Sequence, residues 1–426
     1  MLDAERNRLL TEVGPGTPMG EVLRRHWHPV AAVDALQREP VQAVRLLGED
    51  WVLFREHGGA YGLVERRCAH RGADLAFGYV ENAGLRCHYH GWQFAADGRC
   101  VAQPYEDVVD PQCRLRDKAR LRAGKVRALA GLLWAYVGPD PSPQLPDWEA
   151  FHWRNGFVQV VFADVPCNWL QAQENSIDPV HFEWMHANWG RRLAQRDGPY
   201  APRHLQVAFE AFEHGLVYKR ITEDTDASDP LWTIGRVCLW PNGFFLGDHF
   251  EWRVPVDDTH TRSVLWSFIR VPNESEPFEQ ASIPSWTAPT HDADGRWITS
   301  HVINQDIAGW VGQGAIADRT RECLGASDRG IAMMRRQFLN DIDAIAQGRD
   351  PMGVIRDADA NRAIVLPSDH RDFFLNGLPR AAYERHPKWN KLLRQFIFHA
   401  GQPEAVRLAT ERATGVPQHG PAIVDL

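Results

Sequence analysis

The stretch CAHRGADLAFGYVENAGLRCHYHGW, residues 68–92, combines two cysteines with three histidines. One residue separates Cys68 from His70, and sixteen residues later Cys87 and His90 lie two residues apart. Each half of the stretch therefore offers one thiol and one imidazole, and both groups are frequent metal ligands. The four glycines of the stretch permit tight loops close to a bulky bound group. We expect a metal centre held between two loops.

Two kinds of centre use two cysteines and two histidines. A structural zinc ion binds them in a tetrahedron, and its usual motifs place the cysteines together and the histidines together. A Rieske [2Fe–2S] cluster has two cysteines on one iron and two histidines on the other, and the histidines raise its reduction potential. Because each half of this stretch contributes one residue of each type, the pattern favours the cluster. By spacing, His88 is the histidine that is not a ligand.

Short β-rich runs broken by turn residues surround this stretch. Residues 41–67 read as hairpins, residues 91–102 as a hairpin that turns at Asp97-Gly98, and residues 126–138 as a strand pair. The proline-rich segment GPDPSPQLPDW, residues 138–148, follows as a joint. We therefore expect an α+β chain with an N-terminal helical segment, an all-β metal domain and a second domain. Their predicted bounds are 1–25, 26–140 and 141–426.

The second domain is predicted to contain both sheet and helices. Residues 205–270 alternate apolar and polar side chains in runs that suggest a meandering antiparallel sheet. Residues 327–348 have apolar side chains on one helical face, a capping residue at the start and a glycine at the end. Residues 387–401 are expected to form the last helix.

A second metal site is suggested by ENSIDPVHFEWMH, residues 174–186. Two imidazoles and a carboxylate close together indicate the 2-His-1-carboxylate site of non-haem Fe(II) oxygenases. His181 and His186 are five residues apart, which is about 140° around an α-helix. A local π-turn or a helix end would be needed to bring them to one face. Taken alone, two such histidines are more often ordinary core or surface residues.

CAHRG…CHYHGW resembles the loop pair of the Rieske non-haem iron ring-hydroxylating oxygenases, and D-x2-H-x4-H resembles their iron-binding motif. The resemblance covers most of the chain and implies a helix-grip catalytic domain. It also implies one [2Fe–2S] cluster on Cys68, His70, Cys87 and His90, and one mononuclear Fe(II) on His181 and His186. In that family the aspartate of the second motif is not a ligand; it bridges a cluster histidine of the neighbouring subunit to an iron-binding histidine. The resemblance implies this bridging role for Asp178.

The family's carboxylate ligand must then come later in the chain. Asp306 stands in an Asn-Gln-Asp context followed by a helical segment, as in the family. The alternative for Asp306 is a helix-capping aspartate. Asp292 and Asp318 are competitors whose surroundings do not match the family.

Residues 240–259 and 304–338 look like the phthalate-dioxygenase-like branch, which includes phenoxybenzoate dioxygenases and dehydrodivanillate O-demethylases. The resemblance implies homotrimers or hexamers that use O2 and electrons from a separate NAD(P)H-dependent reductase, with or without a ferredoxin. The chain shows no flavin or nicotinamide motif of its own, so it needs that partner. The expected substrate is an aromatic carboxylate, undergoing either ring dihydroxylation or O-demethylation.

Residues that contact the substrate are harder to infer. Arg236 can anchor a carboxylate through a bidentate contact, but a structural or solvated arginine is the alternative. Several aromatic residues of the second domain can line a pocket, although strand alternation should turn half of them away. They are Trp232, Trp240, Phe244, Phe245 and Trp266.

Composition narrows the function further. The chain has 426 residues and a net charge of −8, which disfavours nucleic-acid binding. No run approaches the roughly 20 apolar residues of a membrane span, and the charged N-terminus does not resemble a secretory signal. Seven cysteines, an odd and sparse set, favour reduced or metal-bound thiols and hence the cytoplasm. Two alternatives stay open: an electron-transfer protein without a mononuclear iron, and a zinc protein.

Overall fold

The computed structural model describes residues 2–112, 114–193, 195, 197–369, 371–385, 394 and 397–416. Its helices are α1 (Ala4–Thr11), α2 (Pro18–Leu23), α3 (Val33–Arg38), α4 (Glu106–Val109), α5 (Leu115–Lys118), α6 (Trp169–Asn175), α7 (Gly190–Leu193), α8 (Pro230–Thr233), α9 (Val302–Val311), α10 (Arg329–Ala346), α11 (Arg371–Asn376), α12 (Arg380–Arg385) and α15 (Glu404–Thr414). Short helical turns are η1 (Leu75–Phe77), η2 (Glu149–His152), η4 (Asn273–Ser275) and η5 (Ala326–Asp328), and η3 (Phe182–Trp189) is a π-helix.

The strands belong to three sheets. The first contains β1 (His28–Ala32), β2 (Val41–Leu46), β3 (Glu49–Arg55), β4 (Tyr61–Glu65), β9 (Ala123–Leu129) and β10 (Leu132–Tyr136). The second contains β5 (Tyr79–Glu81), β6 (Gly84–Arg86), β7 (Gln93–Phe94) and β8 (Cys100–Ala102). The third contains β11 (Gly156–Val165), β12 (His204–Phe212), β13 (Gly215–Thr222), β14 (Arg236–Leu239), β15 (Gly243–Phe245), β16 (His249–Asp257), β17 (His260–Arg270) and β18 (Ser285–Thr287).

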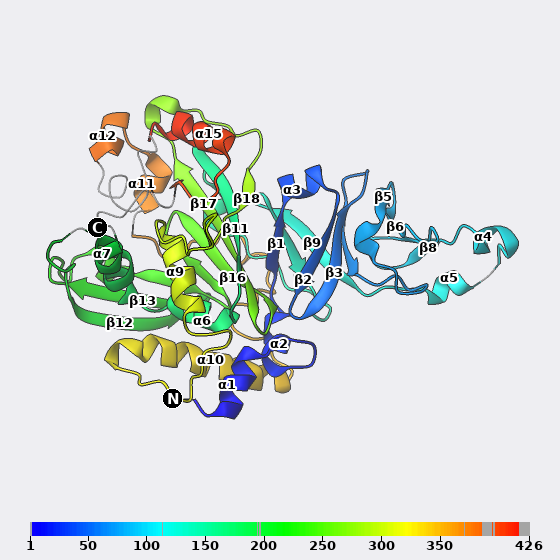
Figure 1. Cartoon of the computed structure of the whole chain (residues 1–426), viewed down its shortest axis with the longest axis horizontal. Coiled ribbons are helices and arrows are strands. Elements are labelled where there is room, and N and C mark those ends of the chain that lie inside the picture. The colour runs from blue at the N-terminus through cyan, green and yellow to red at the C-terminus, as the bar shows by residue number, and fades with distance from the viewer. Residues whose placement is uncertain are drawn as a thin grey trace.

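The first two sheets form the β-rich part of the chain. The first has the order β1-β10-β9-β4-β3-β2, and the predicted 126–138 strand pair is its β9–β10 hairpin. The small β5–β8 sheet lies at one end of the molecule, with α4 and α5 beyond it (Figure 1). A separate apolar core, which includes Phe54, Leu75 and Phe94, lies beneath this sheet. This core supports the loops that contain the paired cysteines and histidines.

The eight-stranded sheet is the antiparallel meander that the sequence predicts, since β12 to β17 pair in chain order. Strand β11 pairs antiparallel with β17, and β18 pairs with β11 in parallel. Helices α6 and α9 lie together near this sheet, and α6 contacts β16 (Figure 1). Alternation along β16 divides its side chains. Phe250 and Trp252 face an aromatic core with Trp134 and Phe151, whereas Glu251 and Arg253 face the helices.

The helices at the two ends of the chain relate to the predicted N-terminal segment and to the two helices expected over 327–348 and 387–401. Helices α1 and α2 pack against α10, and α1 also packs against α6, so the N-terminal segment contacts the second part of the chain. The predicted domain bounds stay predictions. Helix α10 confirms the helix expected over 327–348. Most of the helix expected over 387–401 lies outside the described residues, and α15 shows that it is not the last helix.

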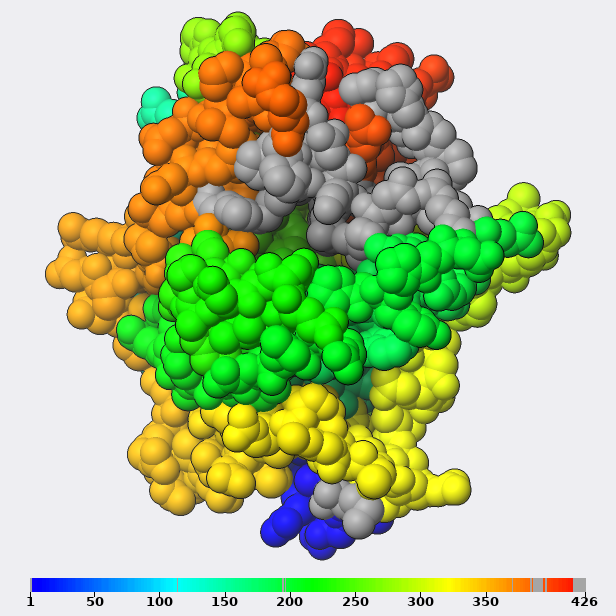
Figure 2. Space-filling view, turned by 90° about the vertical axis from the view of Figure 1, so that its left-hand side faces the viewer, coloured from blue at the N-terminus to red at the C-terminus, as the bar shows by residue number. Residues whose placement is uncertain are grey.

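Two further observations concern the outer surface. None of the described helices has the length and apolar character needed to cross a membrane. Figure 2 shows a face that is hollowed between the green surface, which includes β12 and β13, and the orange surface, which includes α11 and α12.

Candidate metal centres and the adjoining cavity

The two cysteine–histidine segments form loops of matching construction, here called the cluster loops (residues 68–72 and 87–91). In each loop the glycine N–H donates to the cysteine carbonyl four residues earlier, over 2.8 Å for Gly72 and 3.1 Å for Gly91. Both glycines have a positive φ, +73° and +74°, which other residues rarely adopt. The sequence therefore folds each cysteine and histidine onto one tight turn.

The cluster loops place the thiols inside and the imidazoles outside. Cys68 and Cys87 are buried, whereas His70 is half-buried and His90 is exposed. The two imidazole rings lie side by side with centroids 4.7 Å apart, and His70 stacks on Trp92 at 4.4 Å. This arrangement suits a group that has one end in the protein and the other at the surface.

The donor set fits a two-iron cluster better than a single ion. Burial and the neighbouring Cys87 raise the pKa of the Cys68 thiol to about 12, so a strong cation is needed to hold this sulfur as a thiolate. Ligands of one tetrahedral zinc lie within about 4 Å of one another. Among the described residues, no three of Cys68, His70, Cys87 and His90 bring ligand atoms within 4.8 Å of one another. The wider spacing agrees with a cluster whose thiolates and imidazoles bind different irons.

A second group does meet the single-ion distance. His181, His186 and Asp306, here called the triad, offer ligand atoms that all lie within 4.8 Å of one another. The Nε2 atoms of His181 and His186 lie 3.6 and 3.4 Å from the same oxygen, Oδ1 of Asp306. The expected π-turn is present as η3, whose i→i+5 hydrogen bonds bring residues five apart to one face.

The surroundings of the triad fix its donor atoms. Nδ1 of the fully buried His186 donates to Oε1 of Gln305 over 3.0 Å, and Nε2 of Gln305 donates to the Thr299 carbonyl over 2.8 Å. Because the amide nitrogen of Gln305 donates to Thr299, the amide oxygen of Gln305 must be the atom that faces Nδ1 of His186. The proton therefore resides on Nδ1 and leaves the Nε2 lone pair toward Asp306. Nε2 of His186 is buried and has no hydrogen-bond partner, as expected for a metal ligand.

Asp306 and its competitors differ in position. Asp306 is the fifth residue of α9 and buried, so it is not a capping aspartate, and its Oδ1 accepts from Nδ2 of Asn175 over 3.2 Å. Asp292 is exposed and accepts from the backbone of its own turn. Asp318 is exposed and accepts from Thr320. Of the three, only Asp306 reaches the two histidines.

Asp178 lies on the other side of His181. Its Oδ2 is 3.6 Å from Nδ1 of His181, and its Oδ1 accepts from the backbone N–H of Val180. Burial would raise the pKa of Asp178, but the hydrogen bond and charge of His181 outweigh it and lower the pKa. The Asp178 side chain remains 30% exposed, so a group from outside the chain can reach it.

A small cavity adjoins the triad and is here called the triad cavity. Apart from the triad and Asn175, its polar lining comes entirely from β16. The lining residues are Asn175, His181, Phe182, His186, Phe244, Leu246, His249, Glu251, Arg253, Val302 and Asp306. Phe182, Phe244, Leu246 and Val302 supply its apolar walls, and His249, Glu251 and Arg253 form a polar strip on β16.

The predicted substrate residues are placed differently from one another. Phe244 lines the triad cavity, but Phe245 and Trp266 face the opposite side of the sheet, Trp240 stacks on Phe338, and Trp232 lies in α8. Arg236 is not in the lining. Its Cζ lies 4.7 Å from the ring centre of Phe182, and its Nε and Nη1 are shielded and without hydrogen-bond partners. Arg236 therefore lies behind a residue of the cavity wall.

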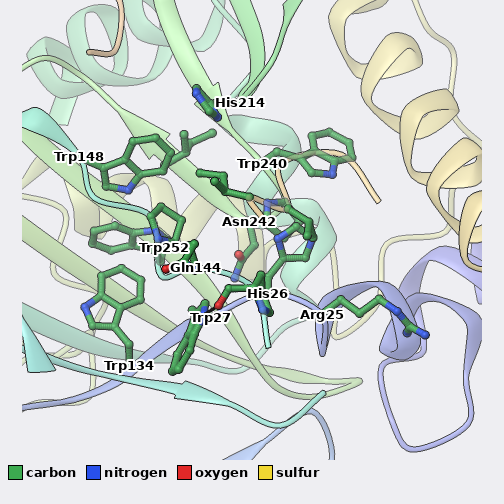
Figure 3. Close-up of a pocket in the computed structure, with 17 residues that line it drawn as sticks. Arg25, His26, Trp27, Trp134, Gln144, Trp148, His214, Trp240, Asn242 and Trp252 are labelled. Carbon is green, nitrogen blue, oxygen red and sulfur yellow. Dashed lines mark hydrogen bonds between the residues drawn. The ribbon is translucent and has the colours of Figure 1, made fainter. Parts of the chain in front are cut away.

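Another cavity lies elsewhere, between the β-rich part and the eight-stranded sheet (Figure 3). Its lining contains Trp27, Trp134, Trp148, Trp240 and Trp252. Trp252 faces away from the triad cavity, so this space is on the opposite side of the sheet. Since the triad, the candidate metal group found among the described residues, lies on the other face, we do not assign the catalytic site to this space.

Sequence reasoning missed Asn175, Gln305 and the pair Glu251 and Arg253. Gln305 directly precedes Asp306 in the quoted Asn-Gln-Asp context, and Asn175 is in the quoted ENSIDP stretch, so both were within reach. The alternating polar residues of β16, in HFEWR, are a signal for one polar strand face. Which face of the sheet holds the triad could not be read from alternation alone.

Comparisons with known proteins agree with this geometry. A family model described as Rieske [2Fe-2S] domain matches residues 26–112, and one described as LigXa C-terminal domain like matches residues 293–367. The chain is 55% identical over its whole length to the whole 5,5'-dehydrodivanillate O-demethylase oxygenase subunit of Sphingobium sp. (strain NBRC 103272 / SYK-6). It is 36% identical to the phenoxybenzoate dioxygenase subunit alpha of Ectopseudomonas oleovorans, over 82% of this chain and 88% of that one.

A solved structure shares the fold. NdmA of Pseudomonas putida CBB5 matches 80% of this chain and 99% of its own, with a TM-score of 0.57 and 19% identity. These matches decide against the zinc protein and against an electron-transfer protein without its own oxygenase chemistry. The chain belongs to the Rieske non-haem iron oxygenases, as the oxygenase (alpha) subunit of a multicomponent enzyme that carries a [2Fe–2S] cluster and a mononuclear iron.

Proposed function

We propose that Cys68, His70, Cys87 and His90 hold the cluster, and that His181, His186 and Asp306 hold the iron. The matched turns of the cluster loops and the convergence of two Nε2 atoms on one carboxylate support these assignments. When bound, the two groups supply stored electrons and O2 activation. The chain's own residues orient the donors: Gln305 sets the tautomer of His186, and Asn175 holds the Asp306 carboxylate.

Electrons pass between two copies of the chain in this proposal. The small β5–β8 sheet lies toward one end of the molecule, whereas α9, which contains Asp306, lies in its other half (Figure 1). Large apolar side chains are exposed near both sites: Phe77 beside the cluster loops, Tyr89 within one of them, and Trp184 and Tyr200 near the triad. A head-to-tail homotrimer or hexamer would cover both groups. Asp178 would then hydrogen-bond a cluster histidine of the neighbouring copy.

The reaction we propose is O-demethylation of a methoxy-substituted aromatic acid. The full-length 55% identity to an oxygenase subunit named for demethylating 5,5'-dehydrodivanillate is the observation that carries this proposal. One oxygen atom of O2 enters a methyl C–H bond, and two electrons and two protons reduce the other to water. The resulting hydroxymethyl ether breaks into the phenol and formaldehyde.

Arg236 is proposed to anchor the substrate's carboxylate. Two of its nitrogens have no hydrogen-bond partner. Its guanidinium lies over the ring of Phe182, which is also part of the wall of the triad cavity. If the substrate's carboxylate binds Arg236, the far end of the substrate's aromatic ring lies beside the triad. The protein partner that supplies electrons in this proposal is a separate NAD(P)H-dependent reductase, with or without a ferredoxin.

Product mass tests the proposed reaction. The purified oxygenase is combined with reductase, NADH, O2 and a panel of biaryl methoxy acids, methoxybenzoates, phenoxybenzoates and phthalates. Loss of one CH2 with release of formaldehyde is expected. A product that gains two oxygens and two hydrogens would instead show ring dihydroxylation, as in the dioxygenase relative.

We also propose that the chain acts in the cytoplasm. The six cysteines that the structure describes are all unpaired, and a reductase that uses NAD(P)H is an intracellular partner. Fractionation of the source cells, with activity measured in each fraction, tests this assignment.

A further inference from the structure

The polar strip that β16 presents to the triad cavity consists of paired charges. Nη1 of Arg253 lies 2.6 Å from Oε2 of Glu251, and both residues are buried. The Arg253 guanidinium also lies over the ring of Trp310, with Cζ 4.8 Å from the ring centre. Trp310 thus limits the movement of the guanidinium, and Glu251 neutralises it where it borders the cavity.

The neighbouring histidine is paired as well. Nδ1 of His249 lies 3.0 Å from Asp248, and its Nε2 lies 3.4 Å from Glu251. Burial would lower the pKa of His249, but these carboxylates outweigh it and raise the pKa. Burial would likewise raise the pKa of Glu251, but Arg253 and His249 lower it to about 2. The two basic residues His249 and Arg253 therefore lie against the carboxylates of Asp248 and Glu251 along this strip.

We propose that the Glu251–Arg253 pair selects substrates by the charge of the group next to the methoxy group on the ring that enters the triad cavity. A neutral phenol at that position is admitted, and a second carboxylate is rejected. This inference rests on the proposed substrate class. A carboxylate brought beside Arg253 would lose its hydration and meet Glu251 at close range. A phenol hydroxyl has no charge to desolvate, and it can donate a hydrogen bond to the Glu251 carboxylate.

The proposal divides the recognition of the substrate between two arginines. Among the described residues, Arg236 has no carboxylate in ion-pair contact and is assigned the substrate's one carboxylate, whereas Arg253 already has Glu251 as its counter-ion. The ring end beside the triad must then be neutral. A guaiacyl ring, with its carboxylate opposite the phenol, meets this requirement, but a phthalate ring does not.

Binding of a matched pair of probes tests the proposal. Vanillate and 2-methoxyterephthalate share the methoxy group and one carboxylate, and differ only in a hydroxyl against a second carboxylate next to the methoxy group. The anaerobic holoenzyme without reductase cannot turn over, so calorimetric titration gives the dissociation constants directly. The wild type is expected to bind vanillate at least tenfold more tightly.

Three variants separate charge from packing. Glu251→Gln leaves the charge of Arg253 uncompensated, and the preference for vanillate is expected to fall at least tenfold or to reverse. Arg253→Met leaves Glu251 alone and should strengthen the preference. Glu251→Gln combined with Arg253→Met makes the strip neutral again and should restore part of the preference for vanillate, because a second carboxylate then loses its hydration without meeting an uncompensated cation. The visible spectrum of the cluster reports folding for each variant.

Several results would overturn the proposal. These are equal binding of the two probes by the wild type, failure of the wild type to bind either probe, or an equal loss for both probes in Glu251→Gln with no recovery in the double variant. The proposed O-demethylation fails differently. It fails if the product assay shows dihydroxylation, and the binding preference would then still report the charge of the cavity.

Discussion

Replacing Gln305 with leucine should loosen the iron without altering the cluster. Gln305 accepts from Nδ1 of His186 over 3.0 Å and donates to the Thr299 carbonyl over 2.8 Å. His186 is 1% exposed, so water cannot replace the lost acceptor. A buried N–H without a partner costs about 1–3 kcal/mol. The imidazole avoids this cost only by moving its proton to Nε2, which removes the donor that faces Asp306.

The metal-bound form should therefore lose about 1–3 kcal/mol, which corresponds to roughly a 10- to 100-fold weaker affinity for Fe(II). Anaerobic equilibrium dialysis against Fe(II), with cluster absorbance measured on the same samples, gives the affinity. Gln313→Leu is the control, because Gln313 is an exposed residue just beyond the same helix. Unchanged Fe(II) affinity in Gln305→Leu would refute the assigned tautomer and the role of His186 as a ligand.

Three further predictions follow from the contacts of other residues. Asp178→Asn should retain iron and cluster but lose at least 90% of turnover, because its carboxylate is assigned to the link between centres; near-normal turnover would exclude that role. Arg236→Met should raise KM at least tenfold for carboxylated substrates, whereas Arg262→Met, which removes a guanidinium from the ring of Phe162, should not. Burial lowers the pKa of His26 to about 3 and of His28 to about 4, so the unfolded chain binds more protons between these values and about 6.5. The free energy of unfolding should thus fall by about 4 kcal/mol from pH 7 to pH 5, as measured by urea titration. His26→Gln should flatten this pH dependence, whereas the control His152→Gln, at an exposed histidine, should not.

The metal-binding segments were the most predictable parts of the molecule because their chemistry restricts residue type and spacing together. The five-residue separation of His181 and His186 is incompatible with one face of an α-helix, and the π-helix η3 resolves this conflict as expected. Asp306 could be chosen over Asp292 and Asp318 only through the resemblance. The structure supplies the physical reason, because Asp306 is buried on α9 while the other two bind within their own turns.

The walls of the cavity were less predictable because they depend on pairing between distant strands. Strand alternation indicated that about half of the proposed aromatic residues would face away, but it could not identify which half. Phe244 lines the cavity because it pairs with Glu251 across β15 and β16. Arg236 pairs with Tyr218 and lies behind Phe182, and no local signal in the sequence marks this long-range contact.

The central claim is that one chain holds two different iron centres, and a count of iron and acid-labile sulfide tests it most directly. The anaerobically purified protein should contain about three iron atoms per two sulfides, and His181→Ala should contain about two per two with an unchanged cluster spectrum. Two iron atoms per two sulfides in the Fe(II)-loaded wild type, or an absence of sulfide, would contradict the claim.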